Sequence, residues 1–378
     1  MPVLNSIADL RERARRRVPK AIFEYADRGS YDEVTLRRNR ADLEAIALRQ
    51  RVGVNVASIA TASTMAGQGC SMPLGIGPTG LTGLFHPDGE LCGARAAAAA
   101  GIPFCLSTVS IGSIEDLREA QVPFWFQLYL MRDRGFNEKL IARARAAGCP
   151  VLVLTLDLPV QGLRRRDAKN GLAVPPSLTL RNAWDVATKP AWALGMMRAR
   201  RRTFGNLEGH LPGPQGLKTL STWISEQFNP AADWQDVAWV RSQWPGKLVI
   251  KGIMDPEDGR RAVDLGADAV VVSNHGGRQL DGAPSTISVL PRIAEALAGR
   301  CEVLFDGGIT CGQDVLRAVA LGARGCLMGK AFLYALAADG ERGVALGLEI
   351  MRRELSTSMA LAGATDIQKT GRSVLWEQ

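Results

Sequence analysis

The histidines of this sequence are few enough to be considered one by one as candidate bases. There are three, at positions 86, 210 and 275. His275 directly follows an apolar run and precedes two glycines, which allow a ligand to approach the backbone closely. His86 lies in a segment typical of a helix entry and is interpreted as structural, and His210 lies in a Gly/Pro-rich loop that indicates no particular role. Because imidazole titrates near neutral pH, we predict that His275 is a base that takes a proton from a substrate.

A carboxylate and two guanidinium groups stand near or after other apolar runs. Asp157 ends one such run, a place where Asp is also commonly a helix or turn cap. At a site shared with His275, it would orient the imidazole and stabilise the imidazolium. Arg164 and Arg278 would grip a substrate carboxylate in bidentate fashion, although the arginines at 164–166 also fit a solvated face. Together these residues predict proton abstraction from an anionic substrate.

Two glycine-rich segments indicate a phosphorylated cofactor. Asp306-Gly307-Gly308 and Leu327-Met328-Gly329 lie at the ends of the last two apolar runs, where barrels build phosphate sites from backbone N–H groups and helix N-termini. Either motif alone is weak evidence. Their order along the chain, with Lys251 at the end of an earlier run, predicts a bound phosphate.

All of these groups stand at or near the ends of short, almost continuously apolar runs, which are typical of parallel strands covered on both faces. Helix-like segments separate the runs, and several of them end in Gly. Eight such strands alternating with helices predict an α/β fold, the TIM (β/α)₈ barrel, with an open doubly wound sheet as the alternative. The predicted strands are 72–78, 103–108, 124–129, 151–156, 248–251, 269–273, 303–306 and 326–328.

The chain is predicted to form a single domain over residues 1–378. Residues 1–70 would be a helical N-terminal extension, 71–340 the barrel, and 341–378 a C-terminal helix and tail. An insert at about 160–245, after the fourth strand, is longer than a usual βα connection. Its segment 191–202 mixes apolar side chains with arginines, so residues 184–215 fit either a membrane interface or a surface loop packed on the barrel.

Composition narrows the class of protein. Hydrophobic residues make up 46% and charged residues 22% of the 378, which allows a large core and argues against global disorder. Lys and Arg outnumber Asp and Glu by 46 to 38, which suits an anionic substrate, a phosphate or an acidic membrane surface. The sequence contains no basic block with interleaved aromatic residues, so its pattern does not predict nucleic-acid binding.

The cysteines and the N-terminus bear on location. Seven scattered cysteines lack CxxC spacing, so we expect reduced thiols and no metal site. No secretory signal and no run long enough for a transmembrane helix is visible. We therefore expect a cytoplasmic protein, either free or peripheral on the inner face of the membrane.

In its motifs, essentially the whole chain resembles the FMN-dependent L-2-hydroxy-acid dehydrogenase/oxidase family, which includes glycolate oxidase, L-lactate dehydrogenase and L-mandelate dehydrogenase. The most specific match is Ser273-Asn274-His275-Gly276-Gly277-Arg278-Gln279-Leu280-Asp281. Shorter matches occur in the expected order at Phe23-Glu24-Tyr25, Gln127-Leu128-Tyr129, Thr155-Leu156-Asp157 and Lys251-Gly252.

The resemblance implies FMN-dependent oxidation of an L-2-hydroxy acid, lactate- or mandelate-like, to the 2-keto acid by a homotetramer. It implies that His275 is the base, supported by Asp157, and that Lys251 faces the N1/O2 edge of the flavin. The implied substrate contacts are Tyr25, Tyr129, Arg164 and Arg278. The implied FMN contacts are Pro78, Thr79, Gly80, Ser107, Gln127, Thr155, Lys251, Ser273, Asp306, Gly307, Gly308, Gly329 and Lys330.

Four positions bear on how the chain differs within that family. Thr310 and Lys330 stand where relatives carry Arg, which predicts weaker FMN binding, by about 1.5–3 kcal/mol for each uncompensated charged hydrogen bond. Val109 replaces the Trp of glycolate oxidases and predicts a roomier pocket. Gly80 stands where oxidases tend to carry Ala, which favours a dehydrogenase that passes electrons to a quinone or another carrier.

Three other functions stay open. A hydroxy-acid oxidase would reduce O₂ to H₂O₂, so turnover with oxygen distinguishes it from a dehydrogenase. An FMN barrel isomerase would use flavin without net oxidation, but the combination of a base with a carboxylate clamp argues against it. A non-catalytic barrel attached through 184–215 would be colourless and would make the polar strand ends incidental.

Overall fold

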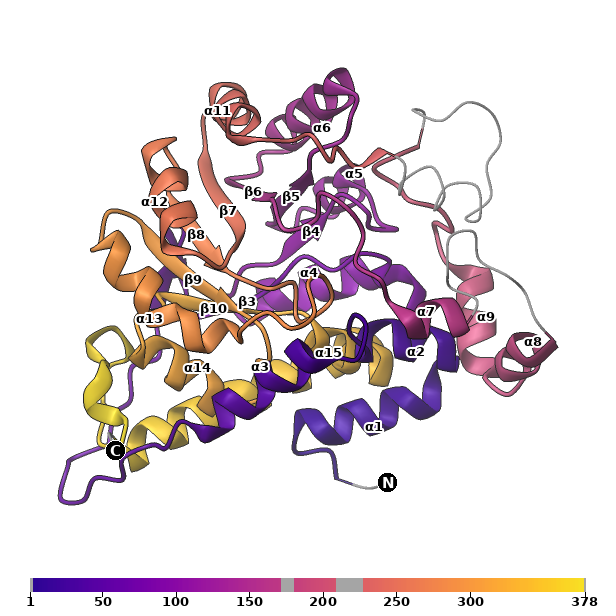
Figure 1. The fold of residues 1–378 in the computed structure, drawn as a ribbon. Helices are drawn as coiled ribbons and strands as arrows, with labels where there is room; N and C mark the ends of the chain where they lie inside the picture. The colour runs from indigo at the N-terminus through magenta and orange to yellow at the C-terminus, as the bar shows by residue number, and fades with distance from the viewer. Residues whose placement is uncertain (1–2, 171–179, 209–226, 377–378) are drawn as a thin grey trace.

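The computed structural model describes residues 3–170, 180–208 and 227–376. Eight parallel strands form one sheet in the order β3-β10-β9-β8-β7-β6-β5-β4. A parallel bridge between Ile76 and Phe104 joins the two outer strands of this order, so the sheet closes on itself. The prediction of a TIM barrel is confirmed, and the open doubly wound sheet is wrong (Figure 1).

Every barrel strand overlaps a run predicted from the sequence. The strands are β3 (Leu74–Ile76), β4 (Cys105–Ser107), β5 (Trp125–Tyr129), β6 (Val151–Thr155), β7 (Lys247–Ile253), β8 (Ala269–Val272), β9 (Glu302–Asp306) and β10 (Gly325–Met328). Nearly all of their residues are buried, because helices cover the outer face and side chains from alternate positions fill the interior.

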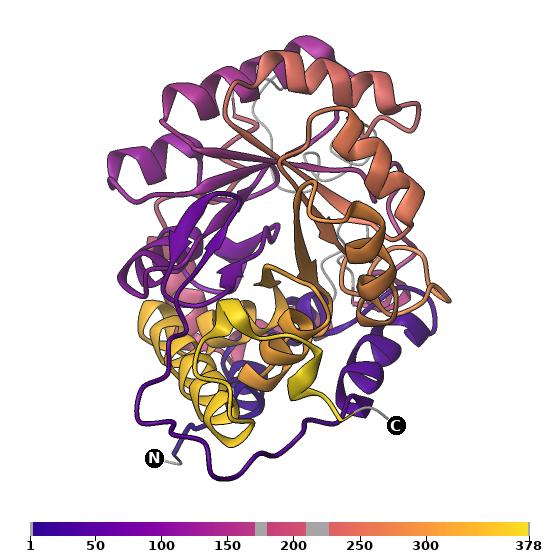
Figure 2. The ribbon, with the colours of Figure 1, turned by 90° about the vertical axis from the view of Figure 1, so that its left-hand side faces the viewer.

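Helices surround the strands, as the end-on view in Figure 2 shows. They are α4 (Gly89–Ala99), α5 (Ile114–Glu119), α6 (Arg134–Ala146), α11 (Trp234–Gln243), α12 (Pro256–Asp264), α13 (Thr286–Leu297), α14 (Gly312–Ala320) and the first part of α15 (Lys330–Leu361). Ser113 and Asp233 show why these helices begin where they do, since each side chain accepts a backbone N–H of the first turn. Helix α15 bends at Asp339 and Gly340, where non-helical backbone interrupts it.

The N-terminal extension holds three helices, α1 (Ile7–Arg17), α2 (Lys20–Asp27) and α3 (Val34–Ala45). Helix α1 packs along α15, and α3 packs against α13 and α14. The extension is not helical to its end, because β1 (Ser63–Met65) and β2 (Gln68–Cys70) form a hairpin. Its turn residues Ala66 and Gly67 have φ of +48° and +72°, the left-handed pair that suits a two-residue hairpin turn. Buried Met65 closes the N-terminal end of the barrel.

The insert between β6 and α11 contributes α7 (Arg165–Lys169), α8 (Leu180–Ala187) and α9 (Pro190–Arg198). These helices gather beside α2 at one side of the barrel (Figure 1). No helix in the described part of the chain is both long and apolar enough to cross a bilayer.

Candidate active site

Neighbouring strands bring the predicted chemical groups together at one mouth of the barrel. Thr155 at the end of β6 pairs with Lys251 of β7, which in turn pairs with Val271 of β8. Asp157 and His275 follow β6 and β8 within a few residues. Because parallel strands end on the same side, the side chains at these ends meet there.

The turn after β8 aims the His275 side chain. His275 has φ of +58°, a left-handed conformation that costs a non-glycine residue about 1–3 kcal/mol and persists only where the surroundings enforce it. Here Ser273 Oγ accepts the His275 N–H at 3.1 Å, and Asn274 Oδ1 accepts the Gly277 N–H at 3.1 Å. The Ser-Asn-His-Gly-Gly motif therefore stabilises a tight turn that points the imidazole at Asp157.

His275 and Asp157 form a partly buried hydrogen-bonded pair. His275 Nδ1 donates to Asp157 Oδ1 at 2.8 Å. Burial alone would raise the pKa of Asp157, but the charges of His275 and Lys251 and their hydrogen bonds hold it below its ordinary value. Burial lowers the pKa of His275, and Asp157 offsets only part of that effect. The pair is thus a neutral imidazole on an ionised carboxylate, with Nε2 positioned to accept a proton.

A buried ammonium group lies at the centre of the site. Lys251, which is 4% exposed, donates to Ser273 Oγ at 2.7 Å. Its Nζ lies 3.3 Å from Asp306 Oδ2 and 3.6 Å from Asp157 Oδ2. Burial alone would lower the pKa of Lys251, but the two carboxylates raise it above its ordinary value. Lys251 therefore keeps a positive charge at the centre of the mouth.

The predicted carboxylate clamp is joined to the N-terminal extension. The Arg278 guanidinium stacks over the Tyr25 ring at 4.7 Å and donates to the carbonyl oxygens of Tyr25 and, at 3.0 Å, Arg28. Arg164 donates to the Arg278 carbonyl at 3.4 Å. Burial, and next the charge of Arg164, lower the pKa of Arg278. Within the described residues, the hydrogen-bond partners of Arg278 and Arg164 at this site are carbonyl oxygens. Two neighbouring cations of this kind can bind an anion.

Asp167 is a buried carboxyl group near this clamp that the sequence did not single out. Burial raises its pKa, while Arg278 and Arg164 oppose the rise. It lies on α7 of the insert, so this short helix borders the clamp.

Tyr129 is held by a residue that the sequence analysis missed. Burial raises the pKa of Tyr129 above its ordinary value. Phe228, where the insert returns to the barrel, packs edge-on against the Tyr129 ring with the centroids 5.4 Å apart. No local pattern marks Phe228 as a site residue.

Several buried polar atoms at this mouth have no hydrogen-bond partner within the described residues. They are Gln127 Nε2, Thr155 Oγ1 and Asp306 Oδ1, whereas Asp157 Oδ2 has only its 3.6 Å ion pair with Lys251. Ser107 Oγ bonds Gln127 Oε1 at 3.0 Å, so the amide nitrogen is left over. Unpaired buried polar atoms are costly and rare in folded proteins. Their donor and acceptor types fit the polar edge of an isoalloxazine ring and a ribityl chain, so the residues present suit FMN.

The end predicted to hold the phosphate combines glycine backbone with nearby cations. Gly307 has φ of +109°, and a Cβ there would lie 2.4 Å from Thr286 Oγ1, so only glycine fits. Lys330 Nζ donates to the carbonyls of Asp27 and Arg28 at 3.0 and 3.1 Å. Burial, and next the charge of Arg278, lower the pKa of Lys330 to about 7.

Arg40 of α3, another residue that the sequence analysis missed, places a guanidinium beside Thr310. It donates to Thr310 Oγ1 and to Gly308 O, both at 2.8 Å, and pairs with Asp314. A positive charge thus reaches the loop of Thr310, the position where the resemblance led us to expect an Arg.

The turn after β3 carries Pro78, Thr79 and Gly80 to the same mouth. A Cβ on Gly80 would lie 2.8 Å from Val109 Cγ2 and 3.7 Å from Tyr25 Oη. This turn and the loop after β4 share a buried carboxylate, since Glu90 Oε1 accepts the N–H groups of Ile111 at 2.8 Å and Gly83 at 3.1 Å. Glu90 therefore ties together the two loops that border Gly80.

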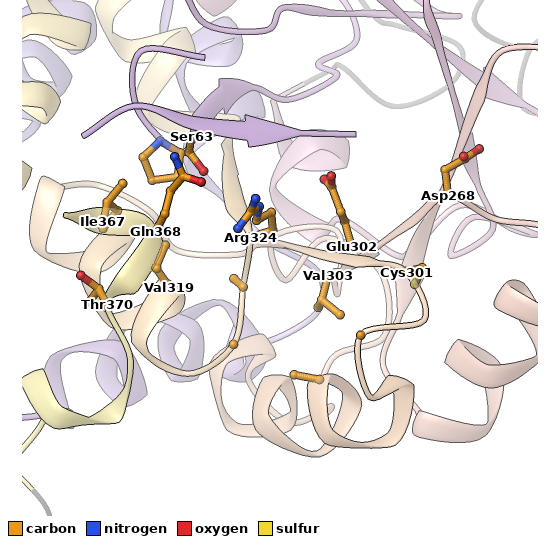
Figure 3. A pocket seen from close by; sticks show the side chains of 15 residues that line it. Ser63, Asp268, Cys301, Glu302, Val303, Val319, Arg324, Ile367, Gln368 and Thr370 are labelled. Carbon is orange, nitrogen blue, oxygen red and sulfur yellow. The ribbon is translucent and has the colours of Figure 1, made fainter. Parts of the chain in front are cut away.

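His86 and the far end of the barrel take no part in this site. His86 Nδ1 lies 2.8 Å from the Pro87 carbonyl, and its ring packs against Gly340, which supports the structural interpretation. His210 lies outside the described residues. A cavity of about 530 Å³ at the N-terminal ends of the strands is lined by Asp268, Glu302 and Arg324 among others, and by none of the predicted site residues (Figure 3).

Residues 184–215, the segment predicted to touch a membrane, contain an exposed apolar part, arginines paired with carboxylates, and a buried part. Trp184 and Met197 of α8 and α9 are 75% and 60% exposed. Arg200 and Arg201, by contrast, bind Asp116 and Glu119 of α5. Residues 204–207 are buried, so within 184–215 the exposed apolar face is confined to α8 and α9; residues 209–215 lie outside the described part.

Three comparisons with known proteins bear on the family of this chain. The model of the FMN-dependent dehydrogenase family matches residues 14–377. The chain is 48% identical to the L-lactate dehydrogenase of Caulobacter vibrioides over 379 residues, covering 100% of this chain and 98% of that protein. The crystal structure of the monotopic membrane protein (S)-mandelate dehydrogenase aligns with a TM-score of 0.94 at 36% identity, covering 100% of both chains. A mandelate oxidase aligns with a TM-score of 0.83 at 37% identity, covering 97% of this chain and 96% of that one.

The resemblance inferred from the motifs is therefore confirmed, and so are its fold and its cofactor. With a family match over nearly all of its length and a barrel mouth suited to flavin, the chain belongs to the FMN-dependent dehydrogenase family.

Proposed function

We propose that this enzyme oxidises a small L-2-hydroxy acid, of the lactate or mandelate type, to the corresponding 2-keto acid. The observation that carries the proposal is the hydrogen-bonded pair of His275 and Asp157, which lies at the same mouth as the clamp of Arg278 and Arg164. Relatives named L-lactate dehydrogenase and (S)-mandelate dehydrogenase support this substrate class.

In the proposed reaction, Arg278 and Arg164 bind the substrate carboxylate, and Tyr25 and Tyr129 contact the carboxylate and the hydroxyl. The Nε2 atom of His275 takes a proton from the substrate. Asp157 keeps the opposite nitrogen protonated and stabilises the imidazolium that forms. Bound FMN supplies the acceptor for the two electrons that leave the substrate.

We propose that FMN lies against Lys251 and the unpaired atoms of Gln127, Thr155 and Asp306, with its phosphate toward Gly308, Gly329 and Lys330. The buried charge of Lys251 supports this arrangement, because it would stabilise negative charge on the flavin. The site therefore combines a base, an anion clamp and an electron acceptor.

Gly80 supports a dehydrogenase that passes electrons to a quinone or another carrier. The alternative is an oxidase that reduces O₂, and the alignment with a mandelate oxidase keeps that alternative in view. Comparing steady-state turnover with O₂ and with a soluble quinone decides between them, because fast peroxide formation would favour the oxidase.

We also propose peripheral contact with the inner face of the membrane through α8 and α9, and a homotetrameric assembly. The exposed side chains of Trp184, Leu194 and Met197 support the membrane contact. Light scattering of the purified enzyme tests the tetramer.

An anaerobic visible spectrum of the FMN-loaded enzyme tests the reaction. We expect L-lactate or L-mandelate, and not the D-acids, to bleach the oxidised flavin band, and the faster acid identifies the substrate type. A bound flavin that no L-2-hydroxy acid reduces would remove the roles of His275, Asp157 and Arg278, and would favour the isomerase-type reaction.

A further inference from the structure

Residues 204–207, here called the anchor segment, are the part of the insert that is buried in the barrel. Phe204, Asn206 and Leu207 are 3%, 0% and 0% exposed. The Gly205 N–H donates to the Ile111 carbonyl at 3.0 Å, and a Cβ on Gly205 would lie 2.7 Å from that oxygen. The anchor segment therefore packs directly on the loop that follows β4.

The side-chain amide of Asn206 makes three hydrogen bonds to that loop. Its Nδ2 donates to Ser107 O at 3.1 Å and to Ser110 Oγ at 3.0 Å. Its Oδ1 accepts the Ile114 N–H at 2.9 Å. An amide suits this position because it needs a donor on one side and an acceptor on the other.

The loop held in this way carries residues of the active site. Ser107 Oγ donates to Gln127 Oε1 at 3.0 Å and accepts the Val109 N–H at 3.3 Å. Val109 is the side chain that a Cβ on Gly80 would strike. Ser107 thus links the Asn206 amide both to the Gln127 amide, which is proposed to face the flavin, and to Val109, which lies opposite Gly80.

We propose that Asn206 is a positioning residue of the active site: by holding Ser107 and the loop after β4, it fixes the Gln127 amide against FMN and Val109 against Gly80. The inference rests on the proposed FMN contacts of Ser107 and Gln127. It makes the long insert a structural part of the flavin site, in addition to whatever its exposed face binds.

The variant Asn206→Asp tests this role with almost no change in shape. A carboxylate still accepts the Ile114 N–H, but it cannot donate to Ser107 O and places a negative oxygen against it. We expect the dissociation constant of FMN to rise by about tenfold or more, and the visible circular dichroism of bound FMN to change. The introduced carboxyl group regains one O–H donor when it is protonated, so the defect relative to wild type should shrink from about pH 9 to about pH 6.

Two further variants separate positioning from stability. Val240→Ala creates a cavity at a fully buried position of α11, away from the loop after β4, and should lower the melting temperature without changing the flavin spectrum. Ser110→Ala removes one of the three Asn206 bonds together with the bonds of Ser110 Oγ to Ser107 O and Gly112 O. It should therefore change the flavin spectrum in the same direction as Asn206→Asp, which keeps the test valid if the Asn206→Asp variant folds poorly.

The outcomes distinguish this inference from the proposed site. If Asn206→Asp binds FMN normally while Ser107→Ala binds it weakly, Asn206 has no positioning role and the site stands. If neither variant changes FMN binding, the assignment of Ser107 to the cofactor fails and the inference fails with it. An Asn206→Asp defect that is independent of pH and equal to that of Val240→Ala would also overturn the inference.

Discussion

His275 Nδ1 lies 2.8 Å from Asp157 Oδ1, and the two side chains are 17% and 10% exposed to solvent. Burial lowers the pKa of His275, whereas the carboxylate of Asp157 raises it. The base is therefore tuned by two opposing effects, and removing one of them has a predictable sign.

Asp157→Asn should reduce kcat by about 10²–10⁴-fold, because the imidazole loses its orientation and the imidazolium its counter-charge. The pKa of His275 should fall further, since only the lowering effects remain. In the proposed reaction only neutral His275 can accept the proton, so we expect the acid limb of kcat/KM to move to lower pH than in wild type. A pH profile of kcat/KM for both proteins measures this, and an unmoved limb would show that His275 does not set it.

FMN binding should weaken as pH rises above about 7. Lys330 has a pKa of about 7 in the protein without its cofactor. A phosphate beside Lys330 would raise that pKa. Between the pKa of Lys330 without FMN and its pKa with FMN bound, binding takes up a proton, so the dissociation constant of FMN increases with pH in that range. Lys330→Arg stays charged and should bind FMN more tightly, with a flatter pH dependence.

Fluorescence titrations of FMN across this pH range measure both proteins. Calorimetry in two buffers of different ionisation enthalpy counts the protons taken up. Parallel curves for wild type and Lys330→Arg would contradict a role for Lys330 at the phosphate.

Gly80→Ala should lower turnover by about tenfold, because the new Cβ would lie 2.8 Å from Val109 Cγ2 and one side must move. Adding Val109→Ala removes the clash and should restore much of the activity. Turnover with a soluble dye measures both effects. A double variant no better than Gly80→Ala would mean that the added Cβ acts on the flavin and not on Val109.

Glu90→Gln should be increasingly stable relative to wild type as pH rises above about 4.5. Burial raises the pKa of Glu90 above its ordinary value of 4.5, so the folded protein holds this proton more tightly than the unfolded chain. Wild-type stability therefore falls as pH rises from about 4.5 through the higher pKa that Glu90 has in the folded protein. Gln keeps an oxygen for the N–H groups of Gly83 and Ile111 and does not titrate. Melting temperatures across this range check the trend, and a constant difference between the two proteins would refute it.

Replacing Trp184 and Met197 together with Gln should reduce binding to anionic lipid vesicles while leaving turnover with a soluble dye unchanged, because these exposed side chains lie on the outer face of the insert. Arg200→Gln is the matched control: its charge already pairs with Asp116 and Glu119, so it should affect vesicle binding much less. A loss of binding in Arg200→Gln with none in the double variant would instead indicate a purely electrostatic contact. Sedimentation with vesicles gives the comparison.

The sequence was sufficient for the features that depend on local pattern. Apolar runs predicted every barrel strand, and the contact of His275 with Asp157 followed from the rule that parallel strands end on one side. The hairpin at β1 and β2 was missed because a pair of three-residue strands around Ala66 and Gly67 has no clear periodicity.

The residues that support the site were harder to predict. Phe228, Asn206 and Arg40 reach it from the insert and the extension, and their roles depend on tertiary contacts that no local spacing encodes. The sequence also could not show which arginines of the insert are available to a membrane. Arg201, for example, pairs with Asp116, which lies 85 residues away in the chain.

The carbonyl oxygen of Arg28 accepts hydrogen bonds from both Arg278 and Lys330. One acceptor at the end of α2 is thus shared by the cation assigned to the substrate and the cation assigned to the cofactor phosphate. A ligand that draws either cation away alters the hydrogen bonding of the other. If the proposed roles of Arg278 and Lys330 hold, we expect FMN and the hydroxy acid to change each other's affinity, and by thermodynamic reciprocity the two factors are equal.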